Sequence, residues 1–382
     1  MKICIVGWYG TETLGDRSIL IGLARVIEKC FGKSKIYLGS IHPFYTERCL
    51  YEDKEFYSKV SPNVEIDVFD IKDMKTYKSV IKNSSIIAMG GGPIMDLYEL
   101  GAIEFGFGYA RKNNVKTAIL GCGVGPLYDK TFREVTSHIL EMSDLIILRD
   151  KLSIIEADNI LLENNRTLDN KIIYLHDPAI IPIGIFLNDQ KEKTRKVDNN
   201  VLINMRAFPS SAFREKKINE SILIEMVKGL ADKFDKVKLL PMHTFSIGGD
   251  DRFYLYKIKQ LTNASNIEVI NKPLSVYELF ETIYEANKCI GMRYHSIVFQ
   301  TLINGNNAII DYTEPNKGKI SGFLNLIDGL DHYKDMYINL QSENSDVSNF
   351  IYNFLKSTQF KTDKDIFIET EQSYVDKVKA LV

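Results

Sequence analysis

The stretch 288–302 reads KCIGMRYHSIVFQTL. Its first four residues, Lys288–Gly291, have the character of a short buried strand, and a helical pattern of apolar residues begins at Ser296. A buried strand that passes directly into a helix predicts a βα unit of a parallel sheet. Arg293 and His295 stand at the junction, so the same stretch places two chemically useful side chains at a strand end.

The alternation of short apolar runs with helical patterns continues along most of the chain. Buried strands separated by helices indicate parallel sheets covered on both faces, and therefore an α/β fold class. The runs that predict strands are Lys2–Gly7, Lys35–Gly39, Glu65–Phe69, Ser85–Gly90, Lys116–Gly121, Leu145–Leu148, Lys171–Leu175, Val201–Met205, Val237–Pro241, Ile267–Ile270, Lys288–Gly291 and Ala308–Asp311.

The length of 382 residues suggests two domains, since a domain takes roughly 150 residues. The pattern breaks at 188–200, where seven of thirteen residues are charged and no apolar period continues. We therefore predict an N-terminal Rossmann-like domain over 1–187, a linker over 188–200 and a second Rossmann-like domain over 201–339. Residues 340–382 are expected to form a helical tail.

Composition excludes several classes of protein. Hydrophobic residues make up 45% and charged residues 26% of the chain, which is typical of a globular protein. A formal charge of -2 offers no basic surface for nucleic acid. No apolar run approaches the roughly 18 residues of a membrane span, and the apolar start at Met1–Gly7 is too short for a signal peptide. We expect a cytoplasmic protein.

The five cysteines and six histidines do not form a metal-binding pattern. The closest pair of cysteines is 19 positions apart, so the sequence contains no CxxC motif. Reduced thiols and no protein-built metal site are expected.

Cationic side chains follow several predicted strands of the second half. Arg293 and His295 lie near a helix amino terminus, where an arginine can grip an anion and a histidine can hold and deliver a proton. The alternative for this pair is a helix cap with a surface ion pair. Arg149 and Arg206 also follow apolar runs, where a lone arginine is more often a solvated ion pair than a ligand.

Glycines gather after the strands of the first half. Gly10–Arg17 has the glycine spacing of a P-loop, but Asp16 and Arg17 replace the lysine and hydroxyl residue, which excludes an NTPase. Gly121-x-Gly123-x-x-Pro126 lacks the third glycine of a dinucleotide fingerprint. Asp16 is then either the cap of a helix starting at Ser18 or a hydrogen-bond acceptor or base towards a hydroxylated substrate. Backbone amides near Gly91, Gly92, Gly123 and Gly125 would cradle a ligand, and Tyr9 would either stack on a sugar or pack.

In their order along the chain, these motifs resemble the polysaccharide pyruvyl transferase family over about residues 3–330. The motifs are Gly15-Asp16, Gly90-Gly91-Gly92, Gly123-Val124-Gly125-Pro126, Arg149-Asp150 with Ser153, Asp177-Pro178, Gly291-Met292-Arg293-Tyr294-His295, and Lys319 before Gly322-Phe323. The resemblance implies two Rossmann-like domains facing each other across a cleft, as in GT-B glycosyltransferases. It also implies a transferase of capsule or exopolysaccharide biosynthesis that uses phosphoenolpyruvate as co-substrate and needs no cofactor.

The resemblance assigns Arg149, His295 and Lys319 to the phosphoenolpyruvate site, and we add Arg206 and Arg293 as anion ligands on physical grounds. His295 is the expected acid, with Asp16 orienting a sugar acceptor. That acceptor belongs to a surface polysaccharide or its lipid-linked precursor, and in the second case the protein would contact the inner face of the cell membrane peripherally.

The chain departs from the family pattern at three places. Thr13 stands where asparagine is usual, Arg17 stands where an acidic residue is usual, and Lys317 competes with Lys319 for one role. Two other functions stay open: a sugar-nucleotide-dependent glycosyltransferase of the same two-domain plan, and a non-catalytic glycan-binding protein that kept the fold. The sequence does not name the acceptor sugar, its hydroxyl pair, the ketal stereochemistry or the oligomeric state.

Overall fold

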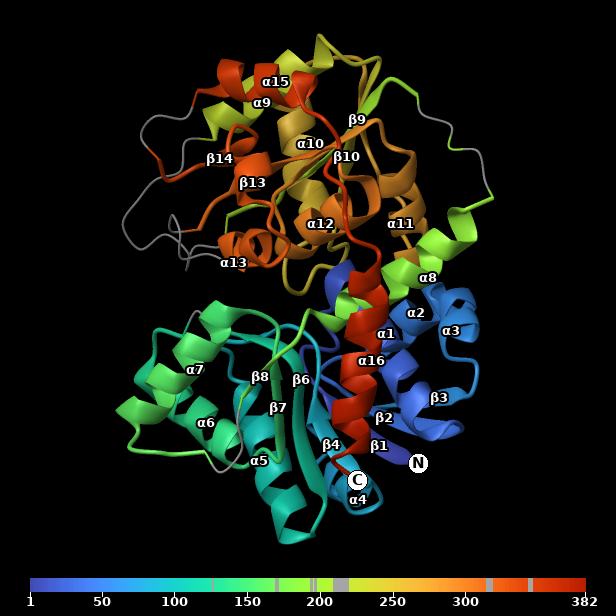
Figure 1. The fold of residues 1–382 in the computed structure, drawn as a ribbon, viewed down its shortest axis with the longest axis vertical. Helices are drawn as coiled ribbons and strands as arrows, with labels where there is room; N and C mark the ends of the chain where they lie inside the picture. Colours follow the sequence, from blue (N-terminus) through green and yellow to red (C-terminus); the bar gives the residue numbers. More distant parts are fainter. Residues whose placement is uncertain are drawn as a thin grey trace. The chain divides into compact units, whose positions relative to one another are not determined.

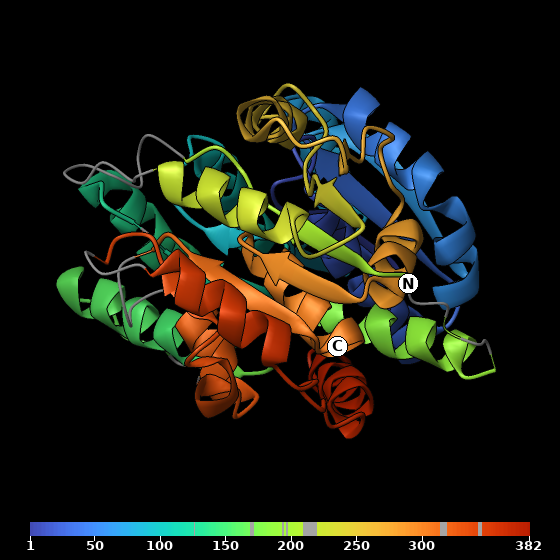
Figure 2. The ribbon, with the colours of Figure 1, turned by 90° about the horizontal axis from the view of Figure 1, so that it is seen from above.

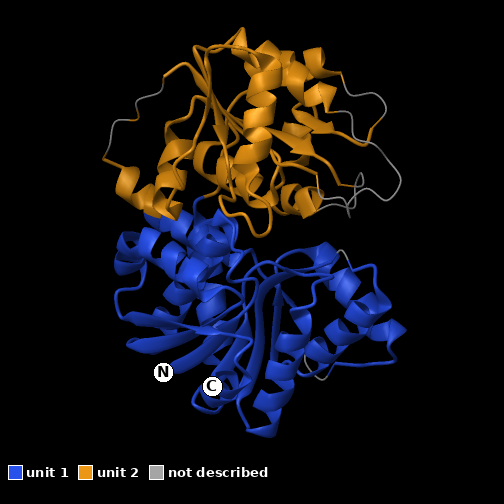
Figure 3. Cartoon of the chain, turned by 180° about the vertical axis from the view of Figure 1, so that it is seen from behind, with its two compact units in different colours: residues 1–185, 364–382 blue, residues 186–363 orange. Residues whose placement is uncertain are grey.

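The computed structural model describes residues 1–125, 127–168, 172–192, 195, 198–208, 220–313, 319–342 and 346–382. The chain forms two compact units (Figure 3). Unit 1 comprises Met1–Ile185 and Lys364–Val382, and unit 2 comprises Phe186–Asp363. Each unit has its own parallel sheet with helices between the strands, which confirms the predicted α/β fold class.

Unit 1 has a parallel sheet in the order β3-β2-β1-β4-β6-β7-β8, with the short β5 paired to the end of β6 (Figure 1). Because the chain runs from β1 outward to β3 and then returns to β4, the topological switch point lies between β1 and β4, where open α/β sheets bind ligands. Its elements are β1 (Lys2–Val6), α1 (Leu14–Phe31), β2 (Ser34–Ser40), α2 (Pro43–Glu52), α3 (Lys54–Val60), β3 (Val64–Asp70), α4 (Met74–Lys82), β4 (Ile86–Met89), β5 (Pro93–Ile94), α5 (Leu100–Lys112), β6 (Lys116–Val124), α6 (Lys130–Glu141), β7 (Leu145–Leu148), α7 (Lys151–Glu163), β8 (Ile173–Tyr174), the 3₁₀ helix η1 (Pro178–Ile180), the start of α8 (Ile181–Gln190) and α16 (Asp365–Lys379).

Unit 2 has a parallel sheet in the order β11-β10-β9-β12-β13-β14, and α15 packs against α9 (Figures 1 and 2). Its switch point lies between β9 and β12. Its elements are β9 (Asn200–Asn204), α9 (Ser221–Ala231), β10 (Lys236–Leu240), α10 (Asp251–Thr262), β11 (Ile267–Val269), α11 (Val276–Glu285), β12 (Lys288–Gly291), α12 (Tyr294–Phe299), the π-helix η3 (Gln300–Asn304), β13 (Asn307–Asp311), α13 (Lys319–Leu326), α14 (Leu330–Tyr333), β14 (Tyr337–Asn339) and α15 (Val347–Lys356).

The central strands are apolar because both of their faces are covered. The sequences IIAM in β4 and LIIL in β7 are buried at every position, as expected for parallel strands between two helical layers. Two helices begin with reciprocal capping boxes, α1 at Thr13 with Asp16 and α11 at Ser275 with Glu278. Because all paired strands run parallel, the loops that follow them lie at one edge of each sheet.

The tail of residues 340–382 contains the helices α15 and α16, but it does not form a separate part of the fold. Its first helix, α15, belongs to unit 2, whereas α16 returns to unit 1 and packs on α1 and η1. The apolar stripe of Tyr374, Val375 and Val378 explains this return, because all three side chains are buried there. The division between the units also lies within α8, before the charged segment 188–200.

Two helices start earlier than the sequence predicts. α1 begins at Leu14 rather than Ser18, so Asp16 is the third residue of the helix and not the cap of a preceding turn. α12 begins at Tyr294, because Arg293 already occupies the extended N-cap position. The short strands β5 and β14 were not predicted, since two or three residues carry too little pattern.

Candidate active site

The switch point of unit 2 brings two predicted arginines together. Arg206 follows β9 and Arg293 follows β12, and these strands are direct neighbours. Burial, and then the positive charge of Arg293, lowers the pKa of the Arg206 guanidinium below its usual value. Two guanidinium groups that repel each other at one sheet edge form a place where a bound anion would relieve the repulsion.

Asp251 holds Arg293 in place, although no sequence motif distinguishes this residue. Arg293 donates from Nε to Asp251 Oδ2 at 2.9 Å and from Nη2 to Oδ1 at 2.5 Å. The same carboxylate accepts hydrogen bonds from the amides of Met242 and His243, at 3.0 and 3.1 Å. A buried bidentate pair fixes the plane of the guanidinium, so Asp251 is a positioning residue.

Asn204 is a second positioning residue, at the last position of β9. Its Oδ1 accepts from the Arg293 amide at 3.0 Å, and its Nδ2 donates to the Leu240 carbonyl at 2.9 Å. One side chain therefore ties β9, β10 and the start of α12 together. A polar residue in the otherwise apolar run Val201–Met205 was the available signal.

His295 lies one residue past the start of α12 and is partly buried. Its ring lies over Phe299 at 5.8 Å and meets the edge of Tyr294 at 5.1 Å. Lys319 is the first residue of α13, which packs against α12 and brings Phe323 to 6.3 Å from Tyr294. The structure thus groups the helix of His295 with the helix of Lys319, whereas Lys317 lies outside the described residues.

Arg149 belongs to unit 1 and is neutralised there. Its Nη1 donates to Asp177 Oδ2 at 2.8 Å, and the side chains are only 2% and 3% exposed. A Cβ at Gly123 would lie 3.1 Å from the Arg149 guanidinium, so the glycine leaves room for this side chain. Tyr374 of α16 donates to the carbonyl of His176 at 3.0 Å, next to Asp177. Arg149 is therefore part of a buried network that includes the C-terminal helix.

The other residues of the Arg-Asp and Ser motif have structural roles. Asp150 caps α7 by accepting from the Ser153 amide at 2.7 Å, and Ser153 Oγ donates to Asp150 at 2.9 Å. The amide of Val124 donates to Ser153 Oγ at 2.8 Å, which fixes the end of β6. The motif holds Arg149 at the strand end rather than supplying further ligands.

Asp16 and the glycine loops lie at the switch point of unit 1. One oxygen of Asp16 caps α1 by accepting from the amide and hydroxyl of Thr13, at 2.9 and 2.8 Å. The other oxygen lies 3.4 Å from where a Cβ of Gly92 would be. Gly91 and Gly92 have φ values of 113° and 73°, and added Cβ atoms would press on Tyr9 and Trp8.

The predicted backbone cradle is therefore largely used for packing. Tyr9 is only 1% exposed, so its ring has no free face for a sugar. The Gly125 amide already donates to the Ile94 carbonyl at 2.8 Å. Pro126 lies outside the described residues.

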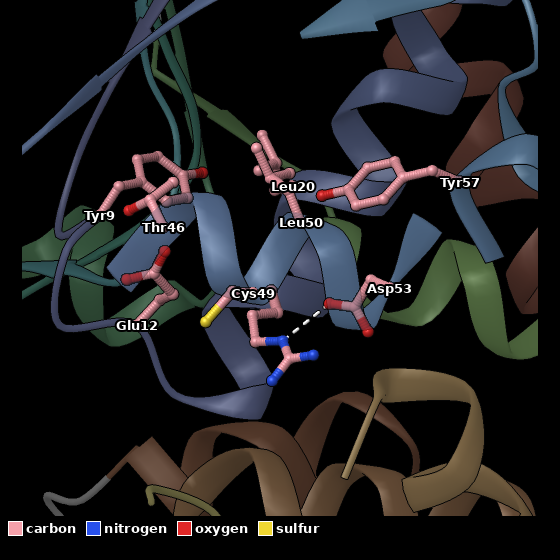
Figure 4. Close-up of a pocket in the computed structure, with 9 residues that line it drawn as sticks. Tyr9, Glu12, Leu20, Thr46, Cys49, Leu50, Asp53 and Tyr57 are labelled. Atoms are coloured by element: carbon pink, nitrogen blue, oxygen red, sulfur yellow. Dashed lines mark hydrogen bonds and ion pairs between the residues drawn. The ribbon is translucent and has the colours of Figure 1, made fainter. Parts of the chain in front are cut away.

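A small cavity behind the first loop is lined by Tyr9, Glu12, Cys49 and Asp53 (Figure 4). Arg17 is also one of its lining residues. Arg17 donates to Asp53 at 2.7 Å and to Glu52 at 2.9 Å, which explains how this basic residue is accommodated after Gly15-Asp16. Although burial acts against its charge, Asp53 and then Glu52 keep the pKa of Arg17 above its usual value. Burial raises the pKa of the nearby Glu12 carboxyl and raises that of Cys49 to about 12. Arg17 thus serves the packing of α1 against α2.

Within the described residues, no group of three or more histidine, cysteine or acidic side chains is arranged to hold a metal ion. None of the described helices is both long and apolar enough to cross a bilayer.

The chain thus consists of two Rossmann-like α/β units, each with its own parallel sheet. The chain belongs to the polysaccharide pyruvyl transferase family, whose model matches residues 14–299, and it is by family a transferase. The GT-B-type fold itself is shared with solved structures of low sequence identity. No curated protein matches the sequence.

UDP-GlcNAc 2-epimerase from Neisseria meningitidis, bound to UDP-GlcNAc, superposes with a TM-score of 0.60 at 12% identity, covering 99% of each chain. HepE from Anabaena, in complex with UDP-glucose, has a TM-score of 0.55 at 10% identity and covers 100% of each chain. A glycosyltransferase from Rickettsia africae has a TM-score of 0.54 at 14% identity, covering 99% of this chain and 93% of its own.

Proposed function

We propose that the protein transfers the enolpyruvyl group of phosphoenolpyruvate to two hydroxyls of one sugar, forming a cyclic ketal and releasing phosphate. The acceptor would be a sugar of a surface polysaccharide or its lipid-linked precursor. The observation that carries this proposal is the Arg206 and Arg293 pair at the switch point of unit 2, in a chain of the pyruvyl transferase family.

Phosphoenolpyruvate carries a carboxylate and a phosphate, and binding it without a metal needs several cations. Asp251 neutralises one charge of the arginine pair, so Arg206 supplies the excess positive charge for one anionic group. Arg293, held flat by Asp251, can present its remaining N–H groups to the same ligand. Lys319 would contact the second anionic group from the start of α13.

In the first step, His295 gives a proton to the methylene carbon of phosphoenolpyruvate, so that C2 becomes electrophilic. A sugar hydroxyl then adds to C2 and loses its proton, which restores the proton balance. General acid catalysis of this kind contributes about 10² to 10⁴ in rate. In the second step, the neighbouring hydroxyl attacks C2, the C2–O bond to phosphate breaks, and phosphate leaves with the second hydroxyl proton.

Asp16 would orient the acceptor through the carboxylate oxygen that the helix cap leaves available. We do not extend this role to that of a general base, because the other carboxylate oxygen of Asp16 already accepts hydrogen bonds from Thr13. Arg149, which pairs with Asp177, is the remaining predicted ligand of phosphoenolpyruvate.

Ligand-induced thermal stabilisation separates this function from that of a sugar-nucleotide glycosyltransferase. Phosphoenolpyruvate at 100 times its dissociation constant should stabilise the protein by about 2.7 kcal/mol, and UDP-sugars should have no effect. Arg206→Ala should abolish the stabilisation. Lys257→Ala, which removes an exposed cation paired with Glu220 in the same unit, should keep it. Stabilisation by UDP-sugars but not by phosphoenolpyruvate would favour the glycosyltransferase.

A further inference from the structure

The outer face of α4 carries a concentration of positive charge that the proposed reaction does not use. Residues 72–82 contain four lysines, Lys72, Lys75, Lys78 and Lys82, against the single acid Asp73. This segment has a formal charge of +3 in a chain whose net charge is -2. All four lysines are exposed.

Helical spacing places three of these lysines on one side of α4, and Lys72 lies just before the helix. Lys75, Lys78 and Lys82 are three and four residues apart, so they share a face. Tyr77 and Ile81 are buried on the opposite face, where Tyr77 donates to the carbonyl of Ala102 at 3.2 Å. The lysine face is thereby fixed outward.

Aromatic side chains of α5 lie among the lysines, since α4 and α5 pack side by side (Figure 1). The Lys78 ammonium is 5.7 Å from the ring centre of Phe105 and 5.9 Å from that of Tyr109, and the Lys82 ammonium is also 5.9 Å from Tyr109. Phe105 and Tyr109 are stacked with centres 5.9 Å apart. Met74, which is 40% exposed, adds an apolar side chain at the start of α4.

Neighbouring carboxylates compensate these charges only weakly, through the attraction between Asp73 and Lys75. Across the described part of the chain, none of the four lysines forms a salt bridge, whereas Lys35 on β2 is paired with both Glu65 and Asp67. The Asp73 carboxylate caps α4, accepting from the amides of Lys75 and Thr76 and from the Thr76 hydroxyl. We define the basic face as Lys72, Lys75, Lys78 and Lys82 with Phe105 and Tyr109.

We propose that the basic face docks the protein on the anionic surface of a lipid bilayer. A cluster of four lysines, three of them on one face of α4, matches the charge of anionic headgroups, and aromatic rings prefer the headgroup level. Docking would bring the enzyme to a lipid-linked acceptor, and this purpose rests on the proposed function. Docking itself does not depend on phosphoenolpyruvate.

Cosedimentation of the full chain with vesicles tests the proposal. The probes are vesicles of phosphatidylglycerol mixed with phosphatidylcholine, and vesicles of phosphatidylcholine alone. The chain should bind the first and not the second, and added salt should weaken binding. The triple variant Lys75→Gln/Lys78→Gln/Lys82→Gln should bind about 100-fold more weakly, at about 1 kcal/mol per lysine.

The matched control is Lys33→Gln/Lys54→Gln/Lys59→Gln, which removes three exposed lysines of unit 1 outside α4 and changes the net charge equally. It should bind like the unaltered chain. The proposal is overturned if the chain ignores anionic vesicles, binds both vesicle types equally, or loses binding to the same degree in both triple variants. Stabilisation by phosphoenolpyruvate is measured on the same variants, so a failure of docking is distinguished from a failure of the proposed reaction.

Discussion

Replacing Asp177 by asparagine should destabilise unit 1 by about 3–5 kcal/mol. The substitution keeps the shape of the side chain and an oxygen to accept from the Ala179 amide, a hydrogen bond of 2.9 Å that starts η1. It removes the charge that faces Arg149 at 2.8 Å. What is lost is therefore the ion pair rather than the helix cap.

The magnitude follows from burial. The two side chains are almost inaccessible to solvent, so water cannot rehydrate the Arg149 guanidinium once its partner is neutral. An uncompensated buried charge costs several kcal/mol, whereas an exposed pair contributes about 0–1 kcal/mol. Glu163→Gln is the matched control, because Glu163 accepts two hydrogen bonds from Arg133 at 2.7 and 2.8 Å but is half-exposed.

Urea unfolding followed by tryptophan fluorescence provides the assay. The chain has one tryptophan, Trp8, which is buried in unit 1 and donates to the Pro93 carbonyl, so the signal reports this unit. We expect a large loss of unfolding free energy for Asp177→Asn and less than about 1 kcal/mol for Glu163→Gln. Equal small losses in both variants would refute the view that Arg149 depends on a buried partner.

Three further predictions concern glycine packing, arginine positioning and pH. Gly121→Ala should lower the free energy of unfolding in urea by several kcal/mol more than Gly32→Ala does. Both glycines have a positive φ, but only at Gly121 would an added Cβ meet another atom, at 2.3 Å. Equal losses in the two variants would contradict this prediction. Asp251→Asn should raise the phosphoenolpyruvate concentration needed for half-maximal stabilisation by about ten-fold, because Arg293 loses its bidentate partner. An unchanged titration would contradict the role of Asp251 in positioning Arg293. Burial lowers the pKa of the His176 imidazole from its ordinary 6.5. The stability that the neutral ring contributes is therefore present above pH 6.5 and is lost as the pH falls. His176→Asn should flatten this pH dependence, which urea titrations at several pH values would measure.

Much of the fold was predictable because buried parallel strands appear in the sequence as short, continuous apolar runs. Runs such as Ile86–Met89 and Leu145–Leu148 are apolar throughout, and the structure has strands in each of these places. The path of the tail was not predictable, since the stripe around Tyr374 shows that α16 must be covered but not by which unit. Contacts between distant segments have no local signal.

The candidate site was predictable to a smaller degree. A cation after a strand pointed to Arg149, but no spacing rule connects it with Asp177, which neutralises it 28 residues later. Asp251 was missed because a Gly-Gly-Asp-Asp loop looks like an ordinary helix start, and only the tertiary contact with Arg293 distinguishes it. Asp16 shows the reverse case, since its local role as a helix cap partner could be read from Thr13 three residues before it.

Acceptor-dependent release of phosphate from phosphoenolpyruvate tests the central claim most directly. The unaltered chain would be assayed with lipid-linked sugars and with nitrophenyl β-galactoside, β-glucoside and β-mannoside, beside His295→Ala, Arg206→Ala and the control Lys257→Ala. We predict release that requires an acceptor, is lost in the first two variants and is retained in the control. Full turnover in His295→Ala would contradict its role as the acid, and the absence of both phosphate release and stabilisation by phosphoenolpyruvate would contradict the proposed function.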